Sequence, residues 1–214
     1  MLASLHALDL QLLYLINQTW SAVWLDPVMA RVSDFNSWRW PLAAAVILTL
    51  IFGGFRGRLL LAMMALCLLI GDAGIDWGFK RAINRPRPLE TEPNLRVVTE
   101  HEITLSVPRV VARGRSFTSG HACNNVALAM VGCAIFGWRA WFLWPWALLV
   151  SYSRVYCAAH YPSDILGSWI VAIVYSYFIL KGAEWAWRWW APGRWPEVFA
   201  RHPRLFWTEG NRQD

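Results

Sequence analysis

The sequence predicts an all-α protein, a polytopic membrane helix bundle of about six helices built as a single domain over residues 1–214. Composition predicts this class in two ways. Of the residues, 57% are hydrophobic and only 16% are charged, whereas about a quarter of a soluble domain is charged. The chain also contains 16 Trp, a residue that is enriched at the headgroup level of membranes.

Five apolar stretches approach the roughly 20 residues that a helix needs to cross a bilayer. They are residues 41–55, 59–79, 122–138, 141–157 and 165–187. The N-terminal stretch 5–35 is interrupted by Asn17, Asp26 and Pro27, so it is either a sixth span or a pair of interfacial helices, and we favour the sixth span. No Lys or Arg precedes Arg31, which is atypical of a secretory signal peptide.

One long polar segment, residues 81–115, separates the second and third of these stretches and contains four prolines. A connection of this length without clear periodicity is usually functional or disordered. We expect its part 89–115 to cap the active site, because it joins two of the motifs described next. The four cysteines form no CxxC pair and predict buried free thiols rather than a disulfide framework or a metal site.

Three short motifs at the ends of apolar stretches hold the residues that indicate chemistry. They are Lys80 with Arg87, then Ser119, Gly120 and His121, then Arg154 with His160 and Asp164. Each motif alone also fits a structural role, as snorkelling anchors, a plain helix N-cap, or a surface histidine beside a capping carboxylate. Together they supply two histidines, one carboxylate and three cations, which is what phosphoryl transfer through a histidine requires.

The residue types fit separate parts of that chemistry. Lys and Arg stabilise charge on phosphoryl oxygens, and a helix that begins near Gly120 offers free N–H groups to an anion. If residues 160–164 are helical, Asp164 shares a face with His160 and hydrogen-bonds one imidazole nitrogen, which leaves the other nitrogen as a nucleophile. Asp76 lies four residues before Lys80 and is either a second-shell partner or a simple structural pair.

The number of spans between the motifs places them on one membrane face. Lys80 ends one span, His121 begins the next, and two further spans return the chain to His160. The short connections with Arg56 and Arg139 and the basic tail fall on the opposite face, which the positive-inside rule makes cytoplasmic. We therefore expect a multi-pass protein of the bacterial cytoplasmic (inner) membrane with its active site facing the periplasm.

The spacings Lys-x6-Arg-Pro, Ser-Gly-His and Ser-Arg-x5-His-x3-Asp, in this order, resemble the three-part signature of the type 2 phosphatidic acid phosphatase superfamily. The signature runs from Lys80 to Asp164, and the chain is similar to the integral-membrane bacterial branch of this family. One position departs from the pattern, because Thr118 stands where the family usually has Pro. This change removes no catalytic side chain.

The resemblance implies a role for each matching residue. His160 is the expected nucleophile, oriented by Asp164, and His121 is the expected acid and then base. The expected phosphate-binding residues are Lys80, Arg87, Ser119, Gly120 and Arg154. The resemblance implies neither a metal nor a cofactor.

The expected function is hydrolysis of a phosphate monoester or pyrophosphate of a lipid through a phosphohistidine. Candidate substrates are undecaprenyl pyrophosphate, phosphatidate, phosphatidylglycerol phosphate and the 1-phosphate of lipid A. A lipid phosphotransferase with the same intermediate and a non-catalytic lipid-binding or transport protein are the alternatives. The expected partners are the lipid phosphate and the bilayer, with no nucleic acid; the oligomeric state is open.

Overall fold

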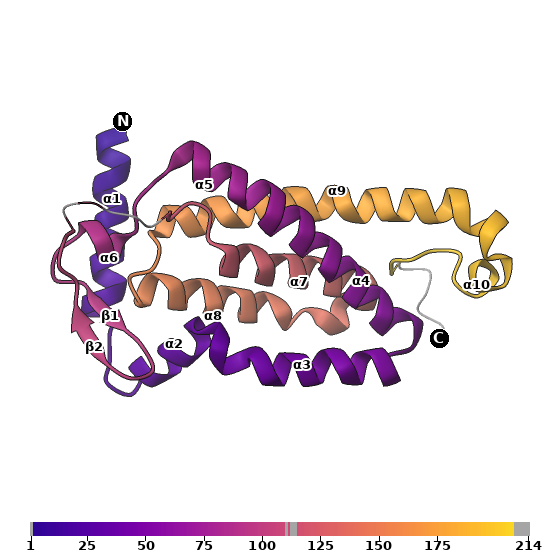
Figure 1. Ribbon diagram of the computed structural model, residues 1–214, viewed down its shortest axis with the longest axis horizontal. Helices are drawn as coiled ribbons and strands as arrows, with labels where there is room; N and C mark the ends of the chain where they lie inside the picture. The colour runs from indigo at the N-terminus through magenta and orange to yellow at the C-terminus, as the bar shows by residue number, and fades with distance from the viewer. Residues whose placement is uncertain (1, 110, 112–114, 208–214) are drawn as a thin grey trace.

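The computed structural model describes residues 2–109, 111 and 115–207, except the side chains of residues 2, 3, 72, 73 and 76. Long helices lie lengthwise in one bundle, and short helices and a two-stranded sheet gather at one end (Figure 1). The helical elements are α1 (Leu2–Tyr14), η1 (Leu15–Thr19), α2 (Asp26–Ser33), α3 (Phe35–Phe52), α4 (Gly54–Ile70), η2 (Gly71–Asp76), α5 (Trp77–Ile83), α6 (Pro88–Thr91), α7 (Gly120–Phe136), η3 (Gly137–Ala140), α8 (Leu143–Tyr156), α9 (Pro162–Arg194) and α10 (Pro196–Arg201).

Three helices in the described part of the chain are long and apolar enough to cross a membrane: α3, α7 with η3, and α9. The helix bundle predicted from composition is therefore confirmed. The predicted span 59–79 is not one regular helix, because the π-helical segment η2 separates α4 from α5. The predicted span 141–157 corresponds to α8, which has only 14 residues.

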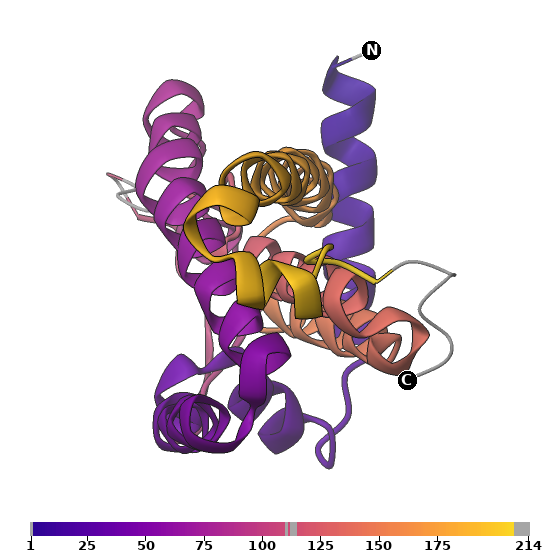
Figure 2. The same cartoon turned by 90° about the vertical axis from the view of Figure 1, so that its right-hand side faces the viewer.

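The N-terminal stretch forms α1 and α2, of 13 and 8 residues. Although η1 continues α1 to Thr19, neither α1 nor α2 is among the described helices that are long and apolar enough to cross a membrane. Two views show α1 lying across the end of the bundle, nearly perpendicular to α9 (Figures 1 and 2). The structure thus favours a pair of short helices over the sixth span that we expected, since the polar residues of this stretch interrupt it.

The main core lies where α4, α7, α8 and α9 meet. Small side chains occupy its centre, including Ala127, Ala147 and Ala172, each at most 1% exposed. Small residues let helix backbones approach closely, which is how helices pack inside membranes. By contrast, α3 has no buried residue and stands at the side of the bundle.

The described part of the polar segment between α5 and α7 has regular structure. It contains α6 and an antiparallel hairpin of β1 (Arg96–Val98) and β2 (Ile103–Leu105). Asn17, which is fully buried, anchors this hairpin, since its amide donates to the carbonyls of Arg96 and Tyr156 at 2.8 and 2.7 Å. Its oxygen also accepts from Arg96 N at 2.8 Å. The hairpin is therefore tied to both the N-terminal segment and the end of α8.

Replacing Asn17 by alanine should destabilise the protein by roughly 1–3 kcal/mol, because it leaves buried backbone groups of Arg96 and Tyr156 unpaired. Denaturant unfolding in detergent micelles measures this change. The neighbouring variant Gln18→Ala is the control, since Gln18 is exposed and makes one hydrogen bond to Asn94 O. Equal stability of the two variants would contradict the anchoring role of Asn17.

Candidate active site

The residues singled out in the sequence lie at the same end of the bundle, where α5 and α8 end and α7 and α9 begin (Figure 1). Lys80 is in the last turn of α5, and Arg154 is in the last turn of α8. Ser119 occupies the N-cap position of α7 without a capping hydrogen bond from its side chain, and the first two residues of the helix are Gly120 and His121. Chain segments that lie far apart in sequence therefore share one site, as the alternation of spans predicts.

His160 lies in the short loop before α9 and is 3% exposed. Its Nδ1 is 2.8 Å from the carbonyl oxygen of Ser116. A carbonyl can only accept a hydrogen bond, so Nδ1 carries the proton and donates it. The other nitrogen, Nε2, then keeps its lone pair, which is the tautomer that a nucleophilic imidazole needs.

The direct hydrogen bond between Asp164 and His160 was expected only if residues 160–164 are helical, and the structure does not meet that condition. The Asp164 carboxylate instead accepts from the hydroxyl of Ser116, from Tyr161 N at 3.0 Å, and from Arg85 Nη1 at 2.7 Å. The reason is that α9 begins at Pro162, so His160 precedes the helix and cannot share a helical face with Asp164. Asp164 is linked to the imidazole of His160 through Ser116, whose hydroxyl donates to Asp164 and whose carbonyl accepts from His160 Nδ1.

Arg85 is a site residue whose role sequence reasoning missed. Its guanidinium donates to Asp164 on one side and to Asp9 of α1 on the other, both at 2.7 Å. It also lies over the ring of Tyr161, with Cζ 3.9 Å from the ring centroid. In the sequence, Arg85 lies between the expected phosphate ligands Lys80 and Arg87, which could have drawn attention to it. Nothing in that pattern indicates that its partners are carboxylates.

A second group of site atoms is buried and has no hydrogen-bond partner within the described protein. Its members are Arg87 Nε, Thr118 Oγ1, Ser119 Oγ, His121 Nε2 and Arg154 Nε. Buried polar groups are almost always satisfied, because desolvation without a partner is costly. Donors from four segments with no protein acceptor suit a ligand with several acceptor oxygens, such as a phosphate.

The same region is strongly positive. Arg87 and Arg154 lie within electrostatic range of both His121 and His160, and Lys80 is within range of His121. Ser33 holds the Arg154 guanidinium in place, since Arg154 Nη1 donates to Ser33 O and Oγ at 2.8 and 2.5 Å. The charge and the unpartnered donors therefore occur together.

Burial, together with the charges of Arg154 and Arg87, lowers the pKa of His160 well below its usual value. His160 is thus neutral at neutral pH.

Asp76 was expected to act as a partner of Lys80. Its side chain lies outside the described part of the structure.

A family model described as the PAP2 superfamily matches residues 56–188, which is more than half of the chain. The chain belongs to the PAP2 superfamily. This membership confirms the resemblance to type 2 phosphatidic acid phosphatases inferred from the three motifs. The crystal structure of Aquifex aeolicus LpxE has the same fold, with a TM-score of 0.59 and 24% identity over 81% of this chain and 95% of that one.

Curated relatives of this PAP2 protein are membrane lipid phosphatases. It is 27% identical to the lipid A 4'-phosphatase of Bacteroides thetaiotaomicron, over 80% of this chain and 75% of the relative. It is 31% identical to the undecaprenyl-diphosphatase BcrC of Bacillus subtilis, over 75% of this chain and 76% of the relative. The match to the lipid A 4'-phosphatase of Porphyromonas gingivalis, at 34% identity, spans only 28% of that protein. These relatives support a lipid phosphatase in a membrane.

His160 should stay neutral, with the proton on Nδ1, when the pH falls through the range near 6.5 where free histidine becomes protonated. A lowered pKa means that protonation requires more acid, so both ring nitrogens should keep neutral-form ¹⁵N shifts until well below that pH. Histidine-labelled protein in detergent provides the measurement, with His160→Gln identifying the signal. Protonation at or above pH 6.5 would contradict the lowered pKa.

Proposed function

We propose that this chain is a metal-independent phosphatase of membrane lipids, which transfers the phosphate to His160 and then to water. The observation that supports this best is the group of unpartnered donors of Arg87, Ser119 and Arg154 beside His160, which is buried, and His121, which is partly buried. Family membership and the lipid phosphatases among its relatives support the same reaction class. No step in the scheme below requires a group outside the chain, the lipid and water.

In the first step, the lone pair of His160 Nε2 attacks phosphorus while the bond from phosphorus to the leaving oxygen breaks. That oxygen is the lipid's own in a monoester and the bridging oxygen in a pyrophosphate. His121 acts as the acid, in the protonated form that the negative charge of the bound phosphate favours. It gives its Nε2 proton to that leaving oxygen, and the lipid departs as an alcohol from a monoester or as a lipid monophosphate from a pyrophosphate. Arg87, Arg154 and Lys80 stabilise the charge that spreads over the non-bridging oxygens. The product on the enzyme is a phosphohistidine.

In the second step, His121 takes a proton from water as that water attacks the phosphorus of the phosphohistidine. The bond from phosphorus to His160 Nε2 breaks, inorganic phosphate leaves, and both histidines return to their starting states. The Nδ1–H of His160 stays on the Ser116 carbonyl throughout, so the imidazole keeps one orientation in both steps.

A cavity beside His121 supports a lipid as the substrate. It lies between α3 and the pair α7 and α8, and apart from His121 and Asn125 its walls are apolar, including Trp38, Leu128 and Trp146. Trp38 and Trp146 meet edge to face across it, with ring centroids 5.3 Å apart. A hydrocarbon chain placed in this cavity would keep its phosphate next to His121.

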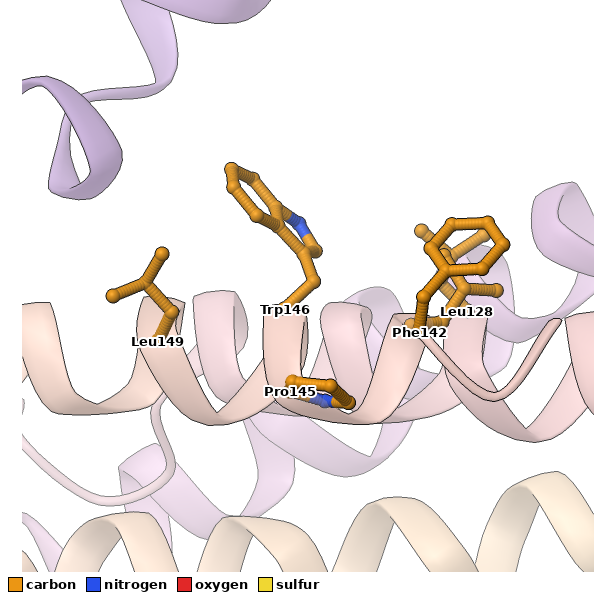
Figure 3. A pocket seen from close by; sticks show the side chains of 6 residues that line it. Leu128, Phe142, Pro145, Trp146 and Leu149 are labelled. Carbon is orange, nitrogen blue, oxygen red and sulfur yellow. The ribbon is translucent and has the colours of Figure 1, made fainter.

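The cavity adjoins a surface groove along α8, and the two share Leu128 and Trp146. Figure 3 shows Trp146 and Leu149 of α8, with Phe142 just before this helix, projecting to the same side. The groove extends the apolar surface away from the site along the length of the bundle. This continuity supports a path for a long lipid chain between α3 and α8.

The position of the basic residues supports a site on the periplasmic side of the inner membrane. Arg56 and Arg58 lie at the start of α4, and Arg139 lies in η3, at the end of the bundle opposite the site. Short loops rich in Lys and Arg stay in the cytoplasm. On this orientation the described part of the segment 89–115 lies at the periplasmic end near His160, where Leu89 N donates to Ala158 O at 3.2 Å.

Purified protein in detergent with EDTA should release phosphate from at least one of undecaprenyl pyrophosphate, lipid A, phosphatidate and phosphatidylglycerol phosphate. His160→Ala should abolish release, and His121→Ala should slow it by about 10²–10⁴-fold, which is the usual size of general acid–base catalysis. His202→Ala is the matched control, since His202 lies beyond α10 at the opposite end of the bundle. Release that survives in His160→Ala would exclude the phosphohistidine scheme.

The same assay separates the alternatives. Transfer of phosphate to an added lipid alcohol without free phosphate would identify a phosphotransferase with the same intermediate. Lipid binding without turnover of any of the four substrates would favour a non-catalytic binding or transport protein.

Leu128→Trp should raise KM for long-chain substrates by about tenfold, equivalent to about 1.4 kcal/mol, because the larger ring fills the cavity. The measurement is the hydrolysis of a series of phosphatidates with about 8 to 18 carbons per chain. The substrate with the shortest chains should be least affected. Leu148→Trp is the control, since Leu148 is exposed on α8 and lines neither cavity nor groove. An equal effect on all chain lengths would place the hydrocarbon elsewhere.

A further inference from the structure

Asp9 of α1 lies in a part of the chain that precedes the family match at residues 56–188. It is 6% exposed and uses both carboxylate oxygens at the site end of the bundle. Oδ1 accepts from Ser163 N at 2.8 Å, and Oδ2 accepts from Ser163 Oγ at 2.5 Å and from Arg85 Nη2 at 2.7 Å. The N-terminal helix thus reaches the first turn of α9.

From Asp9 a continuous set of hydrogen bonds leads to the imidazole of His160. Arg85 bridges Asp9 and Asp164, the Asp164 carboxylate accepts from the Ser116 hydroxyl, and the Ser116 carbonyl accepts from His160 Nδ1. The residues involved come from α1, the loop after α5, the loop before α7, the loop before α9, and the first turn of α9. Each link fixes the next one in position.

We propose that Asp9 and Arg85 are positioning residues for His160, so that α1 sets the orientation of the nucleophile. This inference rests on the proposed function. Asp9 holds Arg85 and the first turn of α9 in one arrangement. Arg85 in turn holds the Asp164 carboxylate against Ser116, whose carbonyl defines the direction of the imidazole. Neither residue touches the phosphate in this assignment.

The contacts of Arg85 allow a role in positioning His160 to be tested separately from general support of the fold. Arg85 contacts two carboxylates at once, each at 2.7 Å, which requires the planar fork of a guanidinium. A lysine keeps the charge but lacks that fork. The chain also provides a matched ion pair without any link to Ser116, between Asp26 and Arg96 at 2.6 Å, with Asp26 as buried as Asp9. It likewise joins the N-terminal segment to the loop between α5 and α7.

The test compares Asp9→Asn and Arg85→Lys with Asp26→Asn in the full chain in detergent micelles. We expect kcat to fall by about 10–100-fold in the first two variants with KM nearly unchanged, since a small misplacement of a reacting group can cost about 10²-fold. The Asp26→Asn variant should lose about as much thermal stability as the other two variants. Its kcat should stay within about twofold of the wild type, which corresponds to about 0.4 kcal/mol.

A second readout does not depend on turnover. The ¹⁵N spectrum of His160 should show a single Nδ1–H form in the wild type and in Asp26→Asn, and a mixture of tautomers in Asp9→Asn and Arg85→Lys. If Asp9→Asn does not fold, Arg85→Lys alone decides the matter. Wild-type kcat and an unchanged tautomer in the folded variants would overturn the inference while leaving the phosphatase intact, whereas an inactive wild type would overturn the proposed function itself.

Discussion

The Asp164 carboxylate, with no exposed surface, accepts from Arg85, from Ser116 and from the backbone of Tyr161. Taking an ionised carboxylate out of water costs several kcal/mol, and that cost is offset only when partners satisfy the oxygens with good geometry. Two of these partners arrive from the segment between α5 and α7. The docking of that segment, the start of α9 and the environment of His160 are therefore one cooperative arrangement.

Polar groups at this end of the bundle fall into two sets with different roles. One set is satisfied within the protein and holds the imidazole of His160, through Ser116 and Asp164. The other set, which includes Ser119 Oγ and Arg154 Nε, is buried without a partner in the described structure. Donors that are fixed before the substrate arrives need no reorganisation when charge develops on the phosphoryl oxygens.

Sequence reasoning located the helix bundle, the shared end of the three motifs and the family, because apolar length and motif spacing are local signals. It did not identify Ser116 as the partner of His160. The helix α9 begins only at Pro162, after His160, and the position of that turn is set by the tertiary structure. Sequence reasoning also missed the contacts of Asp9 and Arg85. Those residues are 76 positions apart, and no local periodicity records a contact between an N-terminal helix and a distant loop.

The Trp-rich end of α9 relates the site to the thickness of the membrane. Asp164 is in the first turn of α9, and Trp185 is exposed near its other end. At about 1.5 Å of rise per residue they are roughly 32 Å apart, close to the roughly 30 Å of a bilayer's hydrocarbon core. On the proposed orientation, with the exposed Trp185 at one headgroup layer, Asp164 lies near the opposite layer, so a thicker or thinner bilayer would change how far a lipid phosphate must move to reach His160.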